Sequence, residues 1–208
     1  MINATRLRRI IGWLGMSLSL IVLALALIYG FGFPDSISLT YYFEPCIAPF
    51  MIILGSAGVM LFGYMGYDKH DDIICSLAGV FAWGICLFPC GTAPRLDADL
   101  RVGTFQLDHV ASGWIHNVCA IVFFGLLAYN SLFLFTKTSG TMTENKKKRN
   151  IIFRVCGIGM IASFLALIPI SMFGLWGGTW AVEAIALIFF GISWLTKAGC
   201  RLLFADKK

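Results

Sequence analysis

Long apolar runs separated by short polar segments dominate this chain. Six of the runs reach or approach the roughly 20 residues that a helix needs to cross a bilayer. The sequence therefore predicts an all-α fold, a polytopic transmembrane bundle of six helices in a single domain over residues 1–208. The six helices are expected at residues 10–31, 47–67, 73–88, 114–135, 151–173 and 179–196.

The composition supports lipid as the surrounding solvent. Hydrophobic residues make up 59% of the chain, charged residues 13%, and the mean hydropathy is +0.83. A soluble domain of this composition would expose large apolar patches to water, which soluble monomers avoid. We therefore expect a multi-pass protein of a cell membrane, either a plasma membrane or a bacterial inner membrane.

The basic residues are unevenly distributed over the predicted loops. With a cytoplasmic N-terminus, only Arg95 and Arg101 of the sixteen Lys and Arg residues lie outside. An excess of Lys and Arg marks the cytoplasmic side, so both termini are predicted to be cytoplasmic. The bases form short clusters rather than a stripe with stacking aromatics, which argues against nucleic acid as a partner. The cluster at 146–149 is interpreted as a topology anchor, with attraction of anionic lipid headgroups as the alternative.

Small residues predict where helices approach one another closely. Ala78, Ala82, Cys86 and Cys90 recur at a spacing of four, which places them on one face of the third helix. Glycines in two other helices are expected to serve the same interior packing. These are Gly55, Gly63 and Gly66 in the second helix and Gly157 and Gly159 in the fifth.

Glu183 is the most informative single residue, because it lies about one turn inside the sixth predicted helix. A carboxylate at membrane depth is costly and usually faces a partner or a water-filled cavity. Glu183 is therefore a candidate catalytic residue or metal ligand. The alternative is that it hydrogen-bonds a neighbouring helix or reaches the nearby interface.

His116 begins the fourth predicted helix, and polar residues precede it at helical spacing. Ser112 and Asp108 lie four and eight residues earlier, and His109 lies seven earlier. If the helix extends that far, these side chains share one face. An imidazole oriented by a carboxylate can bind a metal or move a proton, so His116 is the second candidate catalytic residue. The alternative is a polar residue at the membrane interface.

Together these residues suggest a polar site at the outer end of the bundle. Two histidines and a carboxylate can hold catalytic zinc with one open position. The candidate ligands for a divalent metal such as zinc are His116, His109, Asp108 and Glu183, with Glu44 as a further carboxylate nearby. The spacing of these residues matches no compact metal motif such as HExxH.

Two other polar features have simpler interpretations. Residues 66–72, GYDKHDD, look like a metal cluster but are interpreted as a polar turn whose opposite charges neutralise each other. Cys46 and Cys90 are both predicted at outer helix ends. They can form a disulfide if that face is oxidising and their Cα atoms lie within about 7 Å.

Several short motifs occur in order along roughly residues 35–160. They are SISLTYY (36–42), GYDKHDD (66–72), LFPC (87–90), IHNVCAIVFFGLLAYNSLFLF (115–135), KKKRN (146–150) and CG (156–157). These motifs resemble those of a group of uncharacterised bacterial six-helix membrane proteins, which is distantly similar to the Frag/DRAM/Sfk membrane proteins of eukaryotes. The resemblance implies a six-helix fold and an association with lipid handling, and it transfers no catalytic residues. A second likeness, to seven-helix hydrolases related to alkaline ceramidases, lacks their paired HxxxH and one helix.

Three classes of function remain open from the sequence. The leading hypothesis is a protein that binds or modifies membrane lipids at the outer site around His116 and Glu183. Metal- or histidine-assisted hydrolysis is its enzymatic form. The alternatives are a small transporter or channel, and a non-catalytic scaffold or accessory subunit that binds another membrane protein. The near absence of charge in the central thirds of the helices counts against transport.

Overall fold

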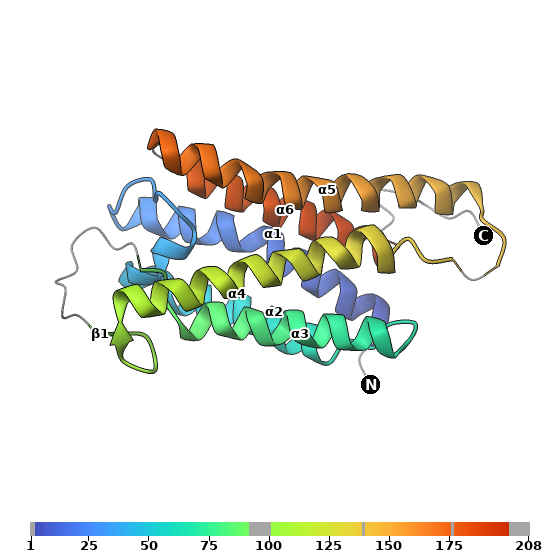
Figure 1. The fold of residues 1–208 in the computed structure, drawn as a ribbon, viewed down its shortest axis with the longest axis horizontal. Helices are drawn as coiled ribbons and strands as arrows, with labels where there is room; N and C mark the ends of the chain where they lie inside the picture. The colour runs from blue at the N-terminus through green and yellow to red at the C-terminus, as the bar shows by residue number, and fades with distance from the viewer. Residues whose placement is uncertain (1–2, 92–100, 139, 176, 200–208) are drawn as a thin grey trace.

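The computed structural model describes residues 3–91, 101–138, 140–175 and 177–199. Within these residues six long helices form the predicted all-α bundle (Figure 1). Each helix is long and apolar enough to cross a membrane, as expected of a multi-pass membrane protein. The helices are α1 (Ala4–Ile28), α2 (Glu44–Phe62), α3 (Lys69–Leu87), α4 (His109–Tyr129), α5 (Glu144–Phe173) and α6 (Gly178–Lys197).

The helices form a ring in chain order, in which each helix packs on the next and α6 closes the ring on α1. One end of the bundle holds the start of α1, the end of α6, the α2–α3 turn and the α4–α5 connection (Figure 1). We call it the terminal end, and the opposite end the loop end. The side of the membrane that each end faces stays a prediction from the basic residues, of which Arg95, Arg201, Lys207 and Lys208 lie outside the described residues.

Four helices begin at least four residues before their predicted starts. Asn3, Asp68, Asp108 and Thr143 are the N-cap residues of α1, α3, α4 and α5, and each side chain accepts a hydrogen bond from a backbone N–H of the first turn. Such caps satisfy amides that have no partner inside the helix. Because the first turns carry polar residues, hydrophobicity alone places these helix starts too late.

Short elements complete the loop end. A 3₁₀ turn, η1 (Ser38–Tyr42), precedes α2, and an antiparallel pair of two-residue strands, β1 (Arg101–Val102) and β2 (Leu107–Asp108), leads into α4. At the other end of α4, residues Asn130–Leu134 continue as a π-helical turn, η2. The connection between α5 and α6 is tight, as predicted. Its glycines Gly174 and Gly177 adopt left-handed backbone conformations that suit a residue without Cβ.

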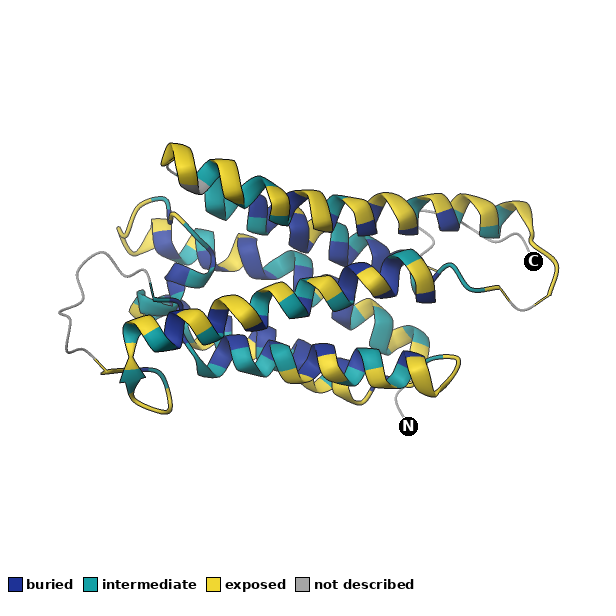
Figure 2. Cartoon of the chain, in the orientation of Figure 1, coloured by how far each residue is buried: buried dark blue, intermediate teal, exposed yellow. Residues whose placement is uncertain are grey.

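The outward faces of the helices are exposed (Figure 2), and many of the exposed side chains are large and apolar. Ile28, Met172 and Phe173 are each at least 75% exposed, a cost in water that lipid removes. The small-residue face predicted for α3 is confirmed in the interior. Ala78, Ala82 and Cys86 are buried, and so is Cys90 just beyond the helix end.

Glycines bring neighbouring helices into close contact, although not all at the expected positions. A Cβ on Gly79 of α3 would lie 2.5 Å from the carbonyl oxygen of Gly58 in α2. Gly157 and Gly159 of α5 closely approach side chains of η2 and α6, respectively, as predicted. For Gly55 the prediction is wrong, since a Cβ there would meet nothing within 4 Å.

Gly79→Ala should therefore destabilise the bundle where Gly55→Ala does not. The new Cβ at Gly79 would meet two backbone atoms, the Gly58 oxygen and the Phe62 nitrogen (2.8 Å), so the helices must separate. Overpacking of this kind costs about 1–3 kcal/mol. Gly55→Ala adds a better helix former in open space and should be neutral or stabilising. Thermal unfolding in detergent measures both, and equal melting temperatures would contradict the close approach.

Candidate functional site

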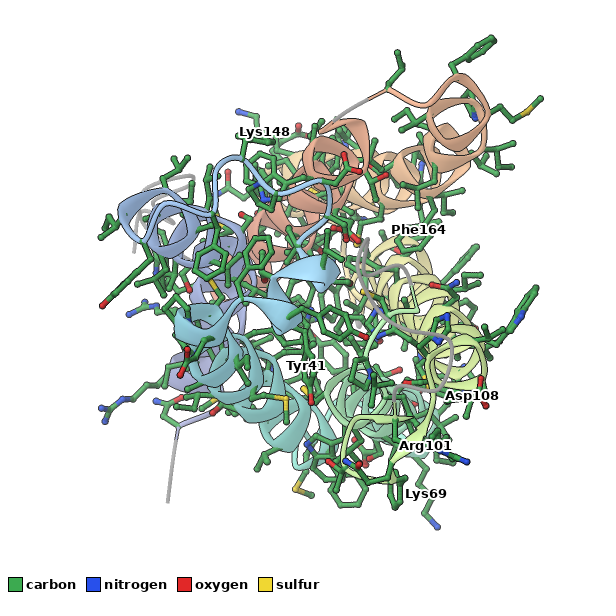
Figure 3. The ribbon with its side chains drawn as sticks, turned by 90° about the vertical axis from the view of Figure 1, so that its left-hand side faces the viewer. Tyr41, Lys69, Arg101, Asp108, Lys148 and Phe164 are labelled. Atoms are coloured by element: carbon green, nitrogen blue, oxygen red, sulfur yellow. The ribbon has the colours of Figure 1, made fainter. Side chains whose placement is uncertain are left out.

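Residues 35–42 cross the loop end and connect three helices; we call this segment the strap. It begins at α6, where the Asp35 carboxylate accepts the Gly177 N–H (2.8 Å) and the Asp35 carbonyl accepts the Trp180 N–H (2.8 Å). In Figure 3, which faces the loop end, Tyr41 of the strap lies over the middle of the bundle. The strap therefore closes the loop end over the helices.

The next residues of the strap form hydrogen bonds with Glu183 of α6. The Ser36 hydroxyl lies 3.0 Å from both Glu183 carboxyl oxygens, and the Ile37 N–H donates to the carboxyl group at 2.5 Å. The Ser36 hydroxyl also accepts the Ser38 N–H at 3.0 Å, so it links Glu183 to the turn that follows. The carboxyl group that the sequence places at membrane depth thus has a complete set of local donors.

His116 of α4 forms a hydrogen bond with Ser38 of the strap. Its Nδ1 lies 2.7 Å from the Phe88 carbonyl oxygen, and its Nε2 lies 3.0 Å from the Ser38 hydroxyl. A carbonyl only accepts, so Nδ1 carries the proton and the Ser38 O–H donates to Nε2 of the neutral ring. The imidazole is 3% exposed, whereas Ser38 is half-buried. A partly accessible hydroxyl thus donates to a buried base with a fixed orientation.

The same region supplies donors to the three residues that follow α3. Buried backbone carbonyls outside regular helix need such partners. His116 bonds the carbonyl of Phe88, the Ser112 hydroxyl donates to that of Pro89 (2.8 Å), and the Tyr42 hydroxyl donates to that of Cys90 (2.6 Å). Burial is the main reason that the pKa of Tyr42 is raised, so the phenol stays a donor. Ser112 and His116 share one face of α4, as their spacing predicts.

The remaining candidate metal ligands do not join this network. Asp108 is exposed at the margin of the loop end (Figure 3), where it caps α4. The Ala111 N–H lowers the pKa of its carboxyl group. His109, in the first turn of α4, has a buried Nδ1 with no hydrogen-bond partner among the described residues, and Glu44 is exposed at the start of α2. Among the described residues, no three His, Cys, Asp or Glu side chains are grouped to hold a metal ion.

The 66–72 turn at the terminal end is a polar turn held by its own backbone and by a distant lysine. Asp71 and Asp72 accept the N–H groups of Tyr67 (3.1 Å) and Gly66 (2.6 Å). Lys137 contacts Asp68 at 2.9 Å and Asp71 at 2.6 Å. The charges are therefore neutralised from the α4–α5 connection rather than by Lys69 within the turn.

Cys46 and Cys90 are not joined by a disulfide in the structure. The Cys46 thiol instead points to the carbonyl oxygen of Val22 at 3.5 Å. Both cysteine side chains are buried in the packed loop end.

Sequence reasoning missed Ser36 and Ser38, the two residues that connect Glu183 to His116. One signal was available, since Asp35, Ser36, Ser38 and Thr40 place polar groups densely in a predicted loop of an otherwise apolar chain. Short polar side chains of this kind bond to nearby backbone and favour turns. Their long-range partners depend on helix packing that no local pattern gives.

Comparison with known proteins identifies no relative of this chain. No protein-family model matches the chain, and neither does any curated protein or solved structure. The likeness to the Frag/DRAM/Sfk group therefore stays a prediction from short motifs, and function has to be argued from the residues themselves.

Glu183→Ala should loosen the strap, whereas Glu183→Gln should largely preserve it. Alanine leaves the Ile37 N–H and the Ser36 hydroxyl without their acceptor, a loss of about 1–3 kcal/mol. Glutamine keeps an oxygen for Ile37 and an amide that can bond Ser36. Thermal unfolding in detergent should rank wild type and Glu183→Gln together, above Glu183→Ala. A Glu183→Ala protein as stable as wild type would contradict the anchoring role.

Acid should break the ion pair between Lys137 and Asp68 of the 66–72 turn. The Lys137 ammonium lowers the pKa of Asp68 from its ordinary value of 3.8 to about 2. A carboxyl group with a lowered folded pKa stabilises fully above its ordinary pKa and loses that contribution as the pH falls toward the folded value. Melting temperatures should therefore fall between pH 4 and pH 2 by a larger amount in wild type than in Lys137→Met. Parallel pH profiles for the two proteins would reject the ion pair as the cause.

Proposed function

We propose that this chain is a lipid-modifying membrane protein in which Ser38 attacks an acyl ester of a lipid and His116 acts as the general base. One observation carries the proposal, the sequence of hydrogen bonds from Ser38 Oγ to His116 Nε2 and from His116 Nδ1 to the Phe88 carbonyl. A nucleophile, a base and a group that orients the base are the parts of a serine hydrolase site. Here a backbone carbonyl takes the orienting place of a carboxylate.

The reaction would proceed in two balanced steps. Ser38 Oγ bonds to the ester carbonyl carbon while His116 Nε2 takes the hydroxyl proton. The bond to the alcohol then breaks, and the imidazolium returns the proton to the departing oxygen. In the second step, water attacks the acyl-serine with His116 again as base, which releases the fatty acid and restores Ser38. Glu183 is a positioning residue in this scheme, since it holds Ser36 and Ile37 beside the nucleophile.

A groove on the membrane-facing side supports lipid as the substrate. It has a volume of about 450 Å³ and lies between α1, from Trp13 to Leu20, and α6, from Trp180 to Ile188. The eight steps along α6 from Trp180 to Ile188 rise about 12 Å, roughly the depth of one leaflet's apolar layer. Its Trp180 end is tied to Asp35, the first residue of the strap. An acyl chain in the groove would thus end beside the strap. The bases at the terminal end support a cytoplasmic terminal end, with the strap on the opposite side.

An activity-based probe tests the nucleophile directly. A fluorophosphonate should label Ser38, forming an Oγ–P bond as fluoride leaves, and mass spectrometry of the peptides locates the adduct. Ser38→Ala should abolish labelling, and His116→Gln should slow it at least about 100-fold, because glutamine can donate to Phe88 but cannot take a proton. Ser76→Ala is the control, because this α3 hydroxyl donates to the Phe62 carbonyl and lies outside the strap.

Two outcomes would overturn the nucleophile. One is labelling that persists in Ser38→Ala; the other is equal labelling rates in wild type and His116→Gln. If purified protein retains lipid but resists the probe, the strap binds lipid without cleaving it, and the enzymatic form of the proposal is rejected.

A further inference from the structure

The terminal end contains a basic cavity that is unrelated to the strap. Its volume is about 210 Å³, far above the roughly 10–15 Å³ that a single water needs. Side chains from α1, the α2–α3 turn, the α4–α5 connection, α5 and α6 surround it. Its five cationic residues are Arg8, Lys137, Lys146, Arg149 and Lys197.

Lys137 has carboxylate partners, whereas Lys146 and Lys197 have neutral ones. Asp68 and Asp71 both pair with Lys137. Lys146 donates to the Phe135 carbonyl at 2.8 Å, and Lys197 lies 4.4 Å from the centre of the Tyr67 ring. These neutral partners fix the position of an ammonium group without cancelling its charge. The cavity therefore keeps a positive potential that an anion would offset.

Thr196 supplies an independent sign of a missing partner. It lines the cavity, is 2% exposed, and its hydroxyl has no hydrogen-bond partner among the described residues. A buried hydroxyl without a partner is costly, and most such groups in proteins are satisfied. An anion oxygen in the cavity would accept a hydrogen bond from this hydroxyl.

From these observations we propose that the cavity binds a phosphate group. A phosphate offers several acceptor oxygens and more than one negative charge, which matches a cavity with both arginine and lysine donors and a hydroxyl. The headgroup of an anionic phospholipid and free phosphate share this chemistry. Lys146 and Arg149 lie on one turn of α5, next to Lys147 and Lys148, which are exposed and do not line the cavity.

The test compares two double variants that remove the same charge from the same helix turn. Lys146→Gln/Arg149→Gln removes two cationic hydrogen-bond donors from the cavity lining. Lys147→Gln/Lys148→Gln is the control. The full chain, delipidated in detergent, is titrated with inorganic phosphate against chloride at equal ionic strength, and separately with short-chain phosphatidic acid against phosphatidylcholine. The cavity variant should bind the phosphate probe at least about tenfold more weakly, since each lost charge-assisted bond contributes about that factor or more. The control should stay within about twofold of wild type, as exposed charges act weakly.

Thr196→Val separates ligand binding from a structural role. Valine keeps the shape and removes the unpaired hydroxyl, so the ligand-free protein should melt at the same or a higher temperature. Its affinity for the phosphate probe should still fall. Phosphatidic acid binding without inorganic phosphate binding identifies a lipid headgroup as the source. Equal affinities identify the phosphate group alone. Equal losses in the two double variants, an unchanged affinity in Thr196→Val, or no binding of either probe would overturn the proposal.

Discussion

A helix bundle in lipid must satisfy its polar groups internally, and at the loop end this requirement is met by the strap and α4. The three residues after α3 present successive carbonyl oxygens, which receive hydrogen bonds from His116, Ser112 and Tyr42. Ser36 and Ile37 of the strap bond to Glu183, and Ser38 bonds to His116. These bonds connect the strap with α4, α6 and the segment after α3. The polar residues of the loop end therefore form one structural unit.

The sequence predicts the architecture well because the bilayer imposes it. Spanning helices must be long and apolar, so hydrophobic runs reveal all six of them, and the tight α5–α6 turn follows from Gly174 and Gly177. Helix starts are less accessible, because caps such as Asp68 and Thr143 lie in polar flanks that resemble loops. Glycine packing is predicted only in part. Which face of α2 meets α3 decides that Gly58 is in close contact and Gly55 is not.

For the candidate site, residue chemistry is more predictable than connectivity. Glu183 and His116 stand out because polar groups at membrane depth are costly and need partners. Their partners are serines in a loop, and serines are too common in loops to stand out. The expected metal set shows the same limit. His109 and Asp108 have suitable donors, but the start of α4 turns Asp108 into an exposed cap. A shared face along a helix thus does not guarantee a shared site.

The two ends of the bundle differ in how far their buried polar groups are satisfied. At the loop end, both ring nitrogens of His116 and the carboxyl group of Glu183 have partners, as a preorganised reactive site requires, because its geometry is fixed before substrate arrives. At the terminal end, the Thr196 hydroxyl is buried without a hydrogen-bond partner among the described residues, beside Lys146 and Lys197, whose described partners are neutral. Leaving such groups unpaired costs stability, so a site of this kind gains most when a ligand enters. The contrast supports the proposed chemistry at the strap and the proposed ligand binding at the basic cavity, and α6 carries residues of both.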